Sequence, residues 1–160
     1  VGGGNSGVQE AMFLTRFATH IDLLVRSELK ASEVLQRKLE TMSDTITVHT
    51  NVTVEEIVAE HEKVVGVRVK QKQTGGERMI EADGVFVFIG LLPNTAFLTG
   101  SGVELDEVGL VKSDENLQTS VAGVFVAGDV RSHATMQIAS AVGDGARAAL
   151  KIREYLARAT

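Results

Sequence analysis

The sequence predicts a mixed α/β fold, and three observations support that prediction. A glycine-rich start leads into a helical pattern and then a short apolar run, which is the order of elements in a βαβ unit. Residues 45–83 alternate between apolar and polar side chains with a period of two, as antiparallel strands do. Two apolar runs, 84–89 and 124–130, have the length of buried strands, and the second precedes a long helical pattern at 135–156.

The composition excludes several classes of function. At 160 residues, 44% of them hydrophobic and 23% charged, the chain is long enough for one good core or two small ones. Its net charge of −5 argues against a nucleic-acid partner, because phosphate binding needs a basic face. No apolar run reaches the ~18 residues of a membrane span, so we expect no membrane segment. The chain has no cysteine, which excludes thiol chemistry within these residues, and the cytoplasm is the expected compartment.

The first residues predict a phosphate-binding turn. Gly2, Gly4 and Gly7 have the spacing G-x-G-x-x-G, in which the glycines permit a tight turn, close approach to a pyrophosphate and tight helix packing. The helix expected at 8–19 presents N–H groups and its positive dipole end to the phosphates. The strand that should precede this turn is missing from these residues, so the motif alone leaves a flexible terminus open as an alternative.

The segment after the buried strand expected at 21–25 bears on the type of dinucleotide. At such a strand end, an acidic residue hydrogen-bonds the ribose of NAD, whereas arginine pairs with the 2′-phosphate of NADP. Arg26 and Lys30 follow this strand and favour NADPH; the alternative is that both only solvate the surface. A second helix is expected at 33–42, with Ser32 as its N-cap.

The alternating segment predicts an antiparallel meander inserted in the α/β domain. Gly75 and Gly76 separate its last two runs, which is a hairpin signal. Its strands are expected at 45–48, 52–58, 64–69 and 78–80. The continuous apolar run 84–89 then predicts a parallel strand that is covered on both faces.

The only proline, Pro93, marks the expected domain boundary, because it interrupts both strand and helix patterns. We therefore expect one domain over residues 1–90 and another over 91–160. In the second, a short strand is expected at 110–111 and a buried strand at 124–130. The helix expected at 135–156 has an apolar face formed by Ile138, Ala141, Val142, Ala149, Ile152 and Leu156.

Two polar residues in the second half are candidate ligand contacts. A strand that ends in a small residue and an aspartate places a carboxylate beside a ligand, so Asp129 is a candidate acceptor for ligand hydroxyls. A turn or capping role for Asp129 is an equal alternative. Gln137 offers an amide to an electron-rich ligand edge, or else is a solvated first-turn residue. None of the four histidines has the spacing of metal ligands, so we expect no metal site and no catalytic residue here.

Four motifs, taken together and in order, resemble the thioredoxin-reductase-like branch of the flavin-dependent pyridine nucleotide-disulfide oxidoreductases. The first, GGGNSGVQEA (2–11), is similar to the NADPH-domain fingerprint, and GLLPNT (90–95) to the segment that leads back to the flavin domain. The third, GVFVAGDV (123–130), is similar to the second flavin motif. The fourth, MQIASAVGDGARAAL (136–150), resembles the helix that faces the isoalloxazine ring. Together they cover nearly the whole chain.

This resemblance implies a Rossmann-like NAD(P)H-binding domain with an antiparallel β-meander insertion over residues 1–90. Over residues 91–160 it implies the C-terminal part of an FAD-binding three-layer ββα domain. The implied cofactors are FAD and either NADPH or NADH. The residues expected at the dinucleotide are Gly2, Gly4, Asn5, Ser6, Gly7, Arg26, Lys30 and Gly90. Those expected at FAD are Gly128, Asp129, Met136, Gln137 and Ile138.

The resemblance also implies a function for the intact protein: electrons pass from NAD(P)H through FAD to a cysteine pair, and on to thioredoxin or a similar protein. The first FAD motif and the Cys-x-x-Cys of the family lie upstream of the glycine turn, so we expect this chain alone to be inactive. We also expect the intact protein to be a homodimer.

Departures from the family pattern leave the dinucleotide open. The family has His-Arg-Arg where Val25, Arg26 and Ser27 stand, and residues 29–39 are similar to alkyl hydroperoxide reductase flavoproteins, which prefer NADH. Two other functions stay open as well: a ferredoxin or flavodoxin NADP reductase of the same architecture, and a nucleotide-binding module without turnover.

Overall fold

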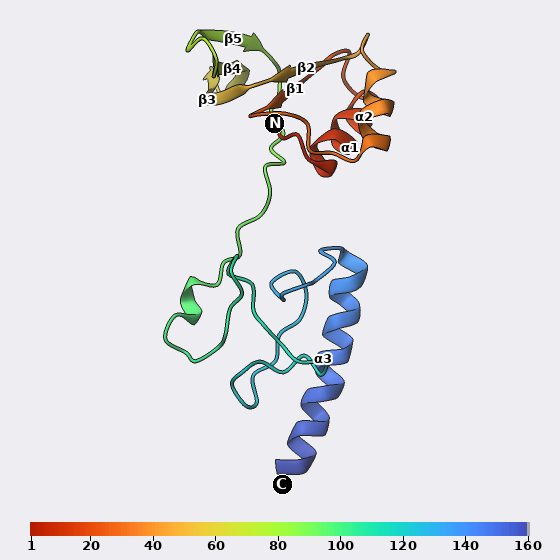
Figure 1. The fold of residues 1–160 in the computed structure, drawn as a ribbon, viewed down its shortest axis with the longest axis vertical. Coiled ribbons are helices and arrows are strands. Elements are labelled where there is room, and N and C mark those ends of the chain that lie inside the picture. The colour runs from red at the N-terminus through yellow and green to blue at the C-terminus, as the bar shows by residue number, and fades with distance from the viewer. Residues whose placement is uncertain (160) are drawn as a thin grey trace. The chain divides into compact units, whose positions relative to one another are not determined.

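The computed structural model describes residues 1–159, and the chain divides into two compact units between Gly90 and Leu91 (Figure 1). The first unit contains one parallel and one antiparallel sheet, and the second contains irregular loops and a long helix. The mixed α/β class predicted from the sequence is therefore confirmed. Among the described residues, no helix has the length and apolar character needed to cross a membrane.

The first unit begins with a βαβ-like arrangement. Its elements are α1 (Asn5–Leu14), β1 (Ile21–Val25), α2 (Glu33–Glu40) and β2 (Ile46–Thr50). The strand predicted at 21–25 is β1, and it pairs in parallel with β2. The two helices cover one face of this pair, where Val8 from α1 and Leu39 from α2 are buried against Leu23 and Val25. Both helices end earlier than the sequence predicts, at residues 14 and 40.

The prediction that residues 45–48 belong to the antiparallel meander is wrong. This segment forms part of β2, which pairs in parallel with β1 and in register from Ile46 opposite Ile21. Period-two alternation is a property of any half-buried strand, because side chains point to opposite faces in turn. The pattern therefore reveals a strand but not the direction of its partner.

The antiparallel sheet contains β3 (Val52–Glu60), β4 (Lys63–Gln71) and β5 (Glu77–Glu81), in the order β3-β4-β5. The predicted hairpin at Gly75 and Gly76 is confirmed, because the Gln71 N–H donates to the Gly76 carbonyl at 2.8 Å. A second core joins this sheet to the other face of β1, through Leu24 from β1 and Val67, Val69 and Ile80 from the antiparallel sheet. The glycine turn and the end of β1 are thus supported from both sides.

The apolar run 84–89 does not form the predicted buried strand. Phe86, Val87 and Ile89 are 54%, 53% and 75% exposed. The Phe88 N–H donates to the Val1 carbonyl at 2.7 Å, and the Val1 amino group donates to the Phe86 carbonyl at 2.6 Å. Because Val1 supplies both of these hydrogen-bonding groups, its pairing with residues 86–88 is too short to form a ladder of strand length.

The second unit contains a 3-10 turn, η1 (Ala96–Leu98), and the long helix α3 (Ile138–Ala159). The strands predicted at 110–111 and 124–130 are absent from the described chain. Val111 makes isolated bridges to Leu105 and Arg131, and Phe125 makes one to Gln118. These single bridges do not extend into ladders, so the apolar runs alone do not make strands here.

The helix α3 packs through only part of the predicted apolar face, because Ala141 lies beside Gly128 while other members of that face are exposed. Ile138 and Val142, on the predicted apolar face, are 86% and 68% exposed. The packed side instead carries buried Ala148 and half-buried Asp144, together with Tyr155, whose ring lies edge-on to Phe125 at 6.0 Å between centroids. These three helix residues recur at intervals of four and seven, which places them on one face. Polar and aromatic contacts therefore act together with small apolar residues in packing this helix within its unit.

Candidate functional site

Two glycines of the turn are required by the protein itself. Gly2 has a φ of +130°, and a Cβ there would lie 2.2 Å from the Phe88 carbonyl oxygen. Gly7 is buried in the first turn of α1, and a Cβ there would lie 2.2 Å from the Gly2 carbonyl oxygen. Both distances are far below van der Waals contact with backbone atoms that have little room to move. The turn therefore closes only with glycine at both positions.

Gly4 has a different environment. It is the N-cap of α1 with a φ of −86°, a conformation open to any residue, and a Cβ there would meet no atom within 4 Å. No side chain caps the helix at this end. The helix thus starts without a side-chain cap where Gly4, Asn5 and Ser6 line open space, as a site for the phosphates of a ligand requires.

The open space belongs to a pocket of about 570 Å³ within the first unit. It is bounded by the glycine turn, the end of β1 and the loop after it, the start of β3, and residues 88–90. Of the residues predicted to contact a dinucleotide, those that line it are Gly2, Gly4, Asn5, Ser6, Arg26, Lys30 and Gly90. Gly7 does not line it and instead packs beneath the turn. The pocket brings these residues together, and their contact with a ligand stays a prediction.

The charges at the pocket favour an anionic ligand. Arg26, Glu28 and Lys30 all line it and are exposed, which leaves an excess of one positive charge among these three side chains. Within residues 1–159, no salt bridge joins Arg26 or Lys30 to an acidic side chain. Both cations are thus available to a phosphate.

Gly3 and Thr53 are among the residues lining this pocket that sequence reasoning missed. Gly3 lines it, and a Cβ there would lie 2.5 Å from Cγ1 of Val25, so a third glycine is needed where the turn crosses β1. The run of three glycines is the signal that shows it. Thr53 also lines the pocket from β3, and nothing in the local sequence indicates this, because it depends on how the two sheets meet.

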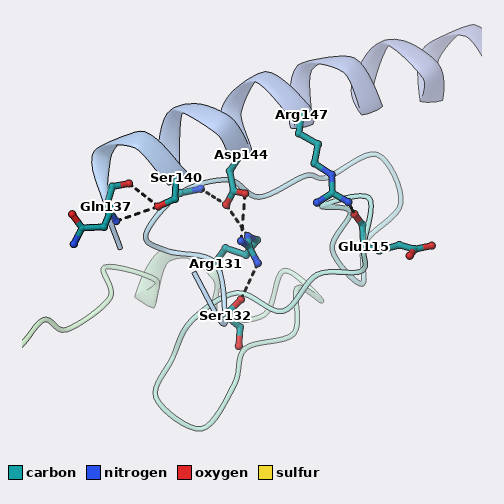
Figure 2. Close-up of polar contacts among 8 residues, drawn as sticks. Glu115, Arg131, Ser132, Gln137, Ser140, Asp144 and Arg147 are labelled. Atoms are coloured by element: carbon teal, nitrogen blue, oxygen red, sulfur yellow. Dashed lines mark hydrogen bonds and ion pairs between the residues drawn. The ribbon is translucent and has the colours of Figure 1, made fainter. Parts of the chain in front are cut away.

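In the second unit, Asp144 of α3 holds the loop that contains Gly128. Figure 2 shows Asp144 pointing from the helix towards Arg131, whose Nε donates to Oδ2 at 2.8 Å. The Gly128 N–H donates to the same oxygen at 3.3 Å, and Gly128 has a φ of +79°. Arg147, one turn further along α3, donates to the Glu115 carbonyl (Figure 2). Sequence reasoning missed Asp144, because its partners lie 13 and 16 residues away in irregular loops.

The residues predicted at FAD lie close in sequence to the two members of this ion pair: Gly128 and Asp129 come just before Arg131, and residues 136–138 come between Arg131 and Asp144. Asp129 is exposed next to Gly128. Met136 has a φ of +53°, a strained value for a residue with a side chain, and is 39% exposed. The Gln137 carbonyl accepts from Ser140 Oγ at 2.8 Å and begins the hydrogen bonding of α3, while Ile138 is 86% exposed. Their contact with a flavin stays a prediction.

Acid is expected to destabilise the second unit. The hydrogen bond from Arg131, followed by the Gly128 N–H, lowers the pKa of Asp144 below its ordinary value. A carboxyl with a lowered folded-state pKa adds stability above its unfolded pKa, and that stability is lost as the pH falls through the folded value. Urea midpoints measured from pH 6 down to pH 2 are expected to fall, and less steeply in Asp144→Asn. Equal slopes in both proteins would contradict this.

The described residues contain no group of three or more histidine, aspartate and glutamate side chains placed to hold a metal ion.

The model of the pyridine nucleotide-disulphide oxidoreductase family matches residues 1–145. Because the match covers most of the chain, the chain belongs to this family. The described glycine turn and the Gly128 loop both lie inside the matched region.

An alkyl hydroperoxide reductase protein of Staphylococcus aureus (strain NCTC 8325 / PS 47) is 43% identical over 159 residues, which cover 99% of this chain and 31% of that protein. The solved thioredoxin reductase of T. acidophilum is 40% identical with a TM-score of 0.77, over 99% of this chain and 51% of that one. That of Lactococcus lactis is 33% identical with a TM-score of 0.78, over 98% and 52%. The resemblance to the thioredoxin-reductase-like branch is confirmed. The chain spans about a third of the curated relatives and half of the solved ones.

Proposed function

We propose that the chain supplies the dinucleotide-binding unit and part of the flavin-binding unit of an NAD(P)H-dependent flavin disulfide reductase. The observation that carries the proposal is the pocket at the glycine turn, where open space over Gly4 meets the N-terminus of α1 and the cations Arg26 and Lys30. Membership of the pyridine nucleotide-disulphide oxidoreductase family supports the same class of ligand. When bound, FAD supplies the redox chemistry, and the protein's part is binding and orientation.

In the first unit, the backbone at Gly4, Asn5 and Ser6 binds the pyrophosphate of the dinucleotide, since the free N–H groups of a helix start attract anions. Arg26 and Lys30 pair with a 2′-phosphate, which makes NADPH the proposed form and NADH the competitor. Gly90 also lines the pocket and is proposed to adjoin the nicotinamide end of the dinucleotide.

In the second unit, Gly128 and Asp129 hold the ribityl and pyrophosphate part of FAD. The Asp144 carboxylate accepts a hydrogen bond from the Gly128 N–H, so the backbone conformation at Gly128 is fixed before a ligand binds. Met136, Gln137 and Ile138 line the flavin ring, and the exposed Met136 and Ile138 offer it apolar atoms. The arrangement positions a flavin and contains no thiol of its own.

The proposed electron acceptor is a disulfide in a thioredoxin-like protein, reached by a homodimer in the cytoplasm. The names of the similar proteins, thioredoxin reductase and alkyl hydroperoxide reductase, support a disulfide or peroxide-linked acceptor over ferredoxin or flavodoxin.

Binding and turnover measurements test this function. Calorimetry is expected to show NADPH binding to the 160-residue chain, without NADPH oxidation when FAD and an acceptor dye are added. The full-length protein that contains this chain is expected to purify with bound flavin. A colourless, flavin-free full-length protein would refute the proposed reductase, and oxidation by the chain alone would refute its predicted inactivity.

Replacing Arg26 with alanine is expected to weaken NADPH binding roughly 10- to 100-fold, because a charge-assisted hydrogen bond to the 2′-phosphate contributes about 1.5–3 kcal/mol. NADH affinity is expected to change little. Lys38→Ala is the matched control, since Lys38 is an exposed cation of α2 that does not line the pocket. Equal losses for both nucleotides, measured by calorimetry, would assign Arg26 to general charge attraction instead.

A further inference from the structure

The loop from Arg26 to Ser32 carries both cations of the pocket and is tied to the glycine turn. The N–H groups of Lys30 and Ala31 donate to the Gly3 carbonyl at 2.7 and 3.0 Å. The Ser32 N–H donates to Oδ1 of Asn5 at 2.8 Å. Three successive backbone N–H groups of the loop therefore donate to the glycine turn and to the first residue of α1.

The other end of the loop is held from the start of the antiparallel sheet. The Asn51 N–H donates to the Ser27 carbonyl at 3.0 Å, and Asn51 has the left-handed φ of +56° between β2 and β3. Of these four hydrogen bonds, three join backbone atoms, and only the bond to Asn5 Oδ1 uses a side chain. A substitution at Asn5 thus loosens the loop without removing Arg26 or Lys30.

We propose that Asn5 is a positioning residue that fixes this loop and thereby sets how strongly the pocket distinguishes NADPH from NADH. The inference rests on the proposed function of the pocket. Ser32 lies two residues after Lys30, so losing its bond to Asn5 removes one of the three hydrogen bonds at the end of the loop that carries this cation and leaves the two bonds to the Gly3 carbonyl. A loop that is ordered before binding avoids the entropy cost of ordering it on the ligand. That saving acts on the 2′-phosphate, the part of NADPH that NADH lacks.

The test compares the ratio of NADPH to NADH affinity in three proteins. The 160-residue chain and its variants Asn5→Ala and Asn5→Asp are titrated with each nucleotide by calorimetry. Asn5→Ala is expected to lower the ratio about fivefold, the worth of one hydrogen bond. Asn5→Asp keeps an oxygen acceptor for the Ser32 N–H and is expected to keep the ratio when the titrations are done at high salt, which screens its charge from the 2′-phosphate. The ratio removes effects on the pyrophosphate, which both nucleotides share.

Amide hydrogen exchange without nucleotide supplies the second readout. Asn5→Ala is expected to speed exchange at Ser32, whereas Asn5→Asp leaves it slow. An unchanged ratio in Asn5→Ala, or an equal fall in both variants, would overturn the positioning role. Failure of the wild-type chain to bind either nucleotide would refute the proposed function of the pocket instead, and exchange at Ser32 would still decide whether Asn5 holds the loop.

Discussion

Gly7→Ala is expected to destabilise the first unit by roughly 3 kcal/mol, as overpacking and buried strain do when the backbone cannot yield. The added Cβ would lie 2.2 Å from the Gly2 carbonyl oxygen, so either α1 or the turn must move. Because residues of the turn line the pocket, dinucleotide binding is expected to be lost as well. Urea denaturation and calorimetry on the same preparation measure the two effects.

Gly4→Ala is the matched control for this prediction. A Cβ at Gly4 meets no protein atom within 4 Å, so the free energy of unfolding is expected to fall by less than about 1 kcal/mol, the cost of a poorer N-cap. The same Cβ enters the space proposed for the pyrophosphate, so nucleotide affinity is expected to fall in a well-folded protein. Full affinity in Gly4→Ala would show that the ligand does not approach this backbone.

Asp144→Ala is expected to have the largest effect in the second unit, about 2 kcal/mol, because it leaves the Gly128 N–H without its acceptor and reduces the half-buried Arg131 guanidinium to its bond with the Ser132 carbonyl. The loop around Gly128 is expected to loosen and flavin affinity of the full-length protein to fall. Thermal unfolding and flavin release measure the two effects.

Glu154→Ala provides the comparison on the same helix. Its carboxylate pairs with Lys151 in an i,i+3 ion pair, with 45% and 30% of the two side chains exposed. Because water and salt screen such a surface pair, its loss is expected to lower the midpoint of thermal unfolding far less than the loss of Asp144 does. Similar losses in the two variants would show that the ion pair of Asp144 has no special role in the loop.

Local chemistry predicted the elements whose partners lie nearby in the sequence. The strand Ile21–Val25 was predictable because its own apolar run and the helix before it define a βαβ start. The hairpin at Gly75 and Gly76 was predictable because glycine chemistry alone favours the turn. One motif and one neighbouring loop likewise grouped six of the pocket-lining residues, namely Gly2, Gly4, Asn5, Ser6, Arg26 and Lys30.

Elements that depend on distant partners were not predictable in the same way. The apolar runs 84–89 and 124–130 have strand composition, but a strand also needs a neighbouring backbone to accept its hydrogen bonds, and composition does not reveal one. Asp144 lies in a helix and Arg131 in a loop. Because no sequence periodicity relates the two positions, their ion pair could not be predicted from the spacing of residues. The direction of β2 depends on its partner and not on its own alternation.

The strand β1 belongs to both hydrophobic cores of the first unit, with Leu23 and Val25 in one and Leu24 in the other. Neither core can melt without exposing the strand that completes the other. The first unit is therefore expected to unfold cooperatively, in one transition with coincident spectroscopic and calorimetric midpoints, although it contains two separate sheets. A nucleotide bound at the end of β1 would then protect the antiparallel sheet from unfolding without touching most of it.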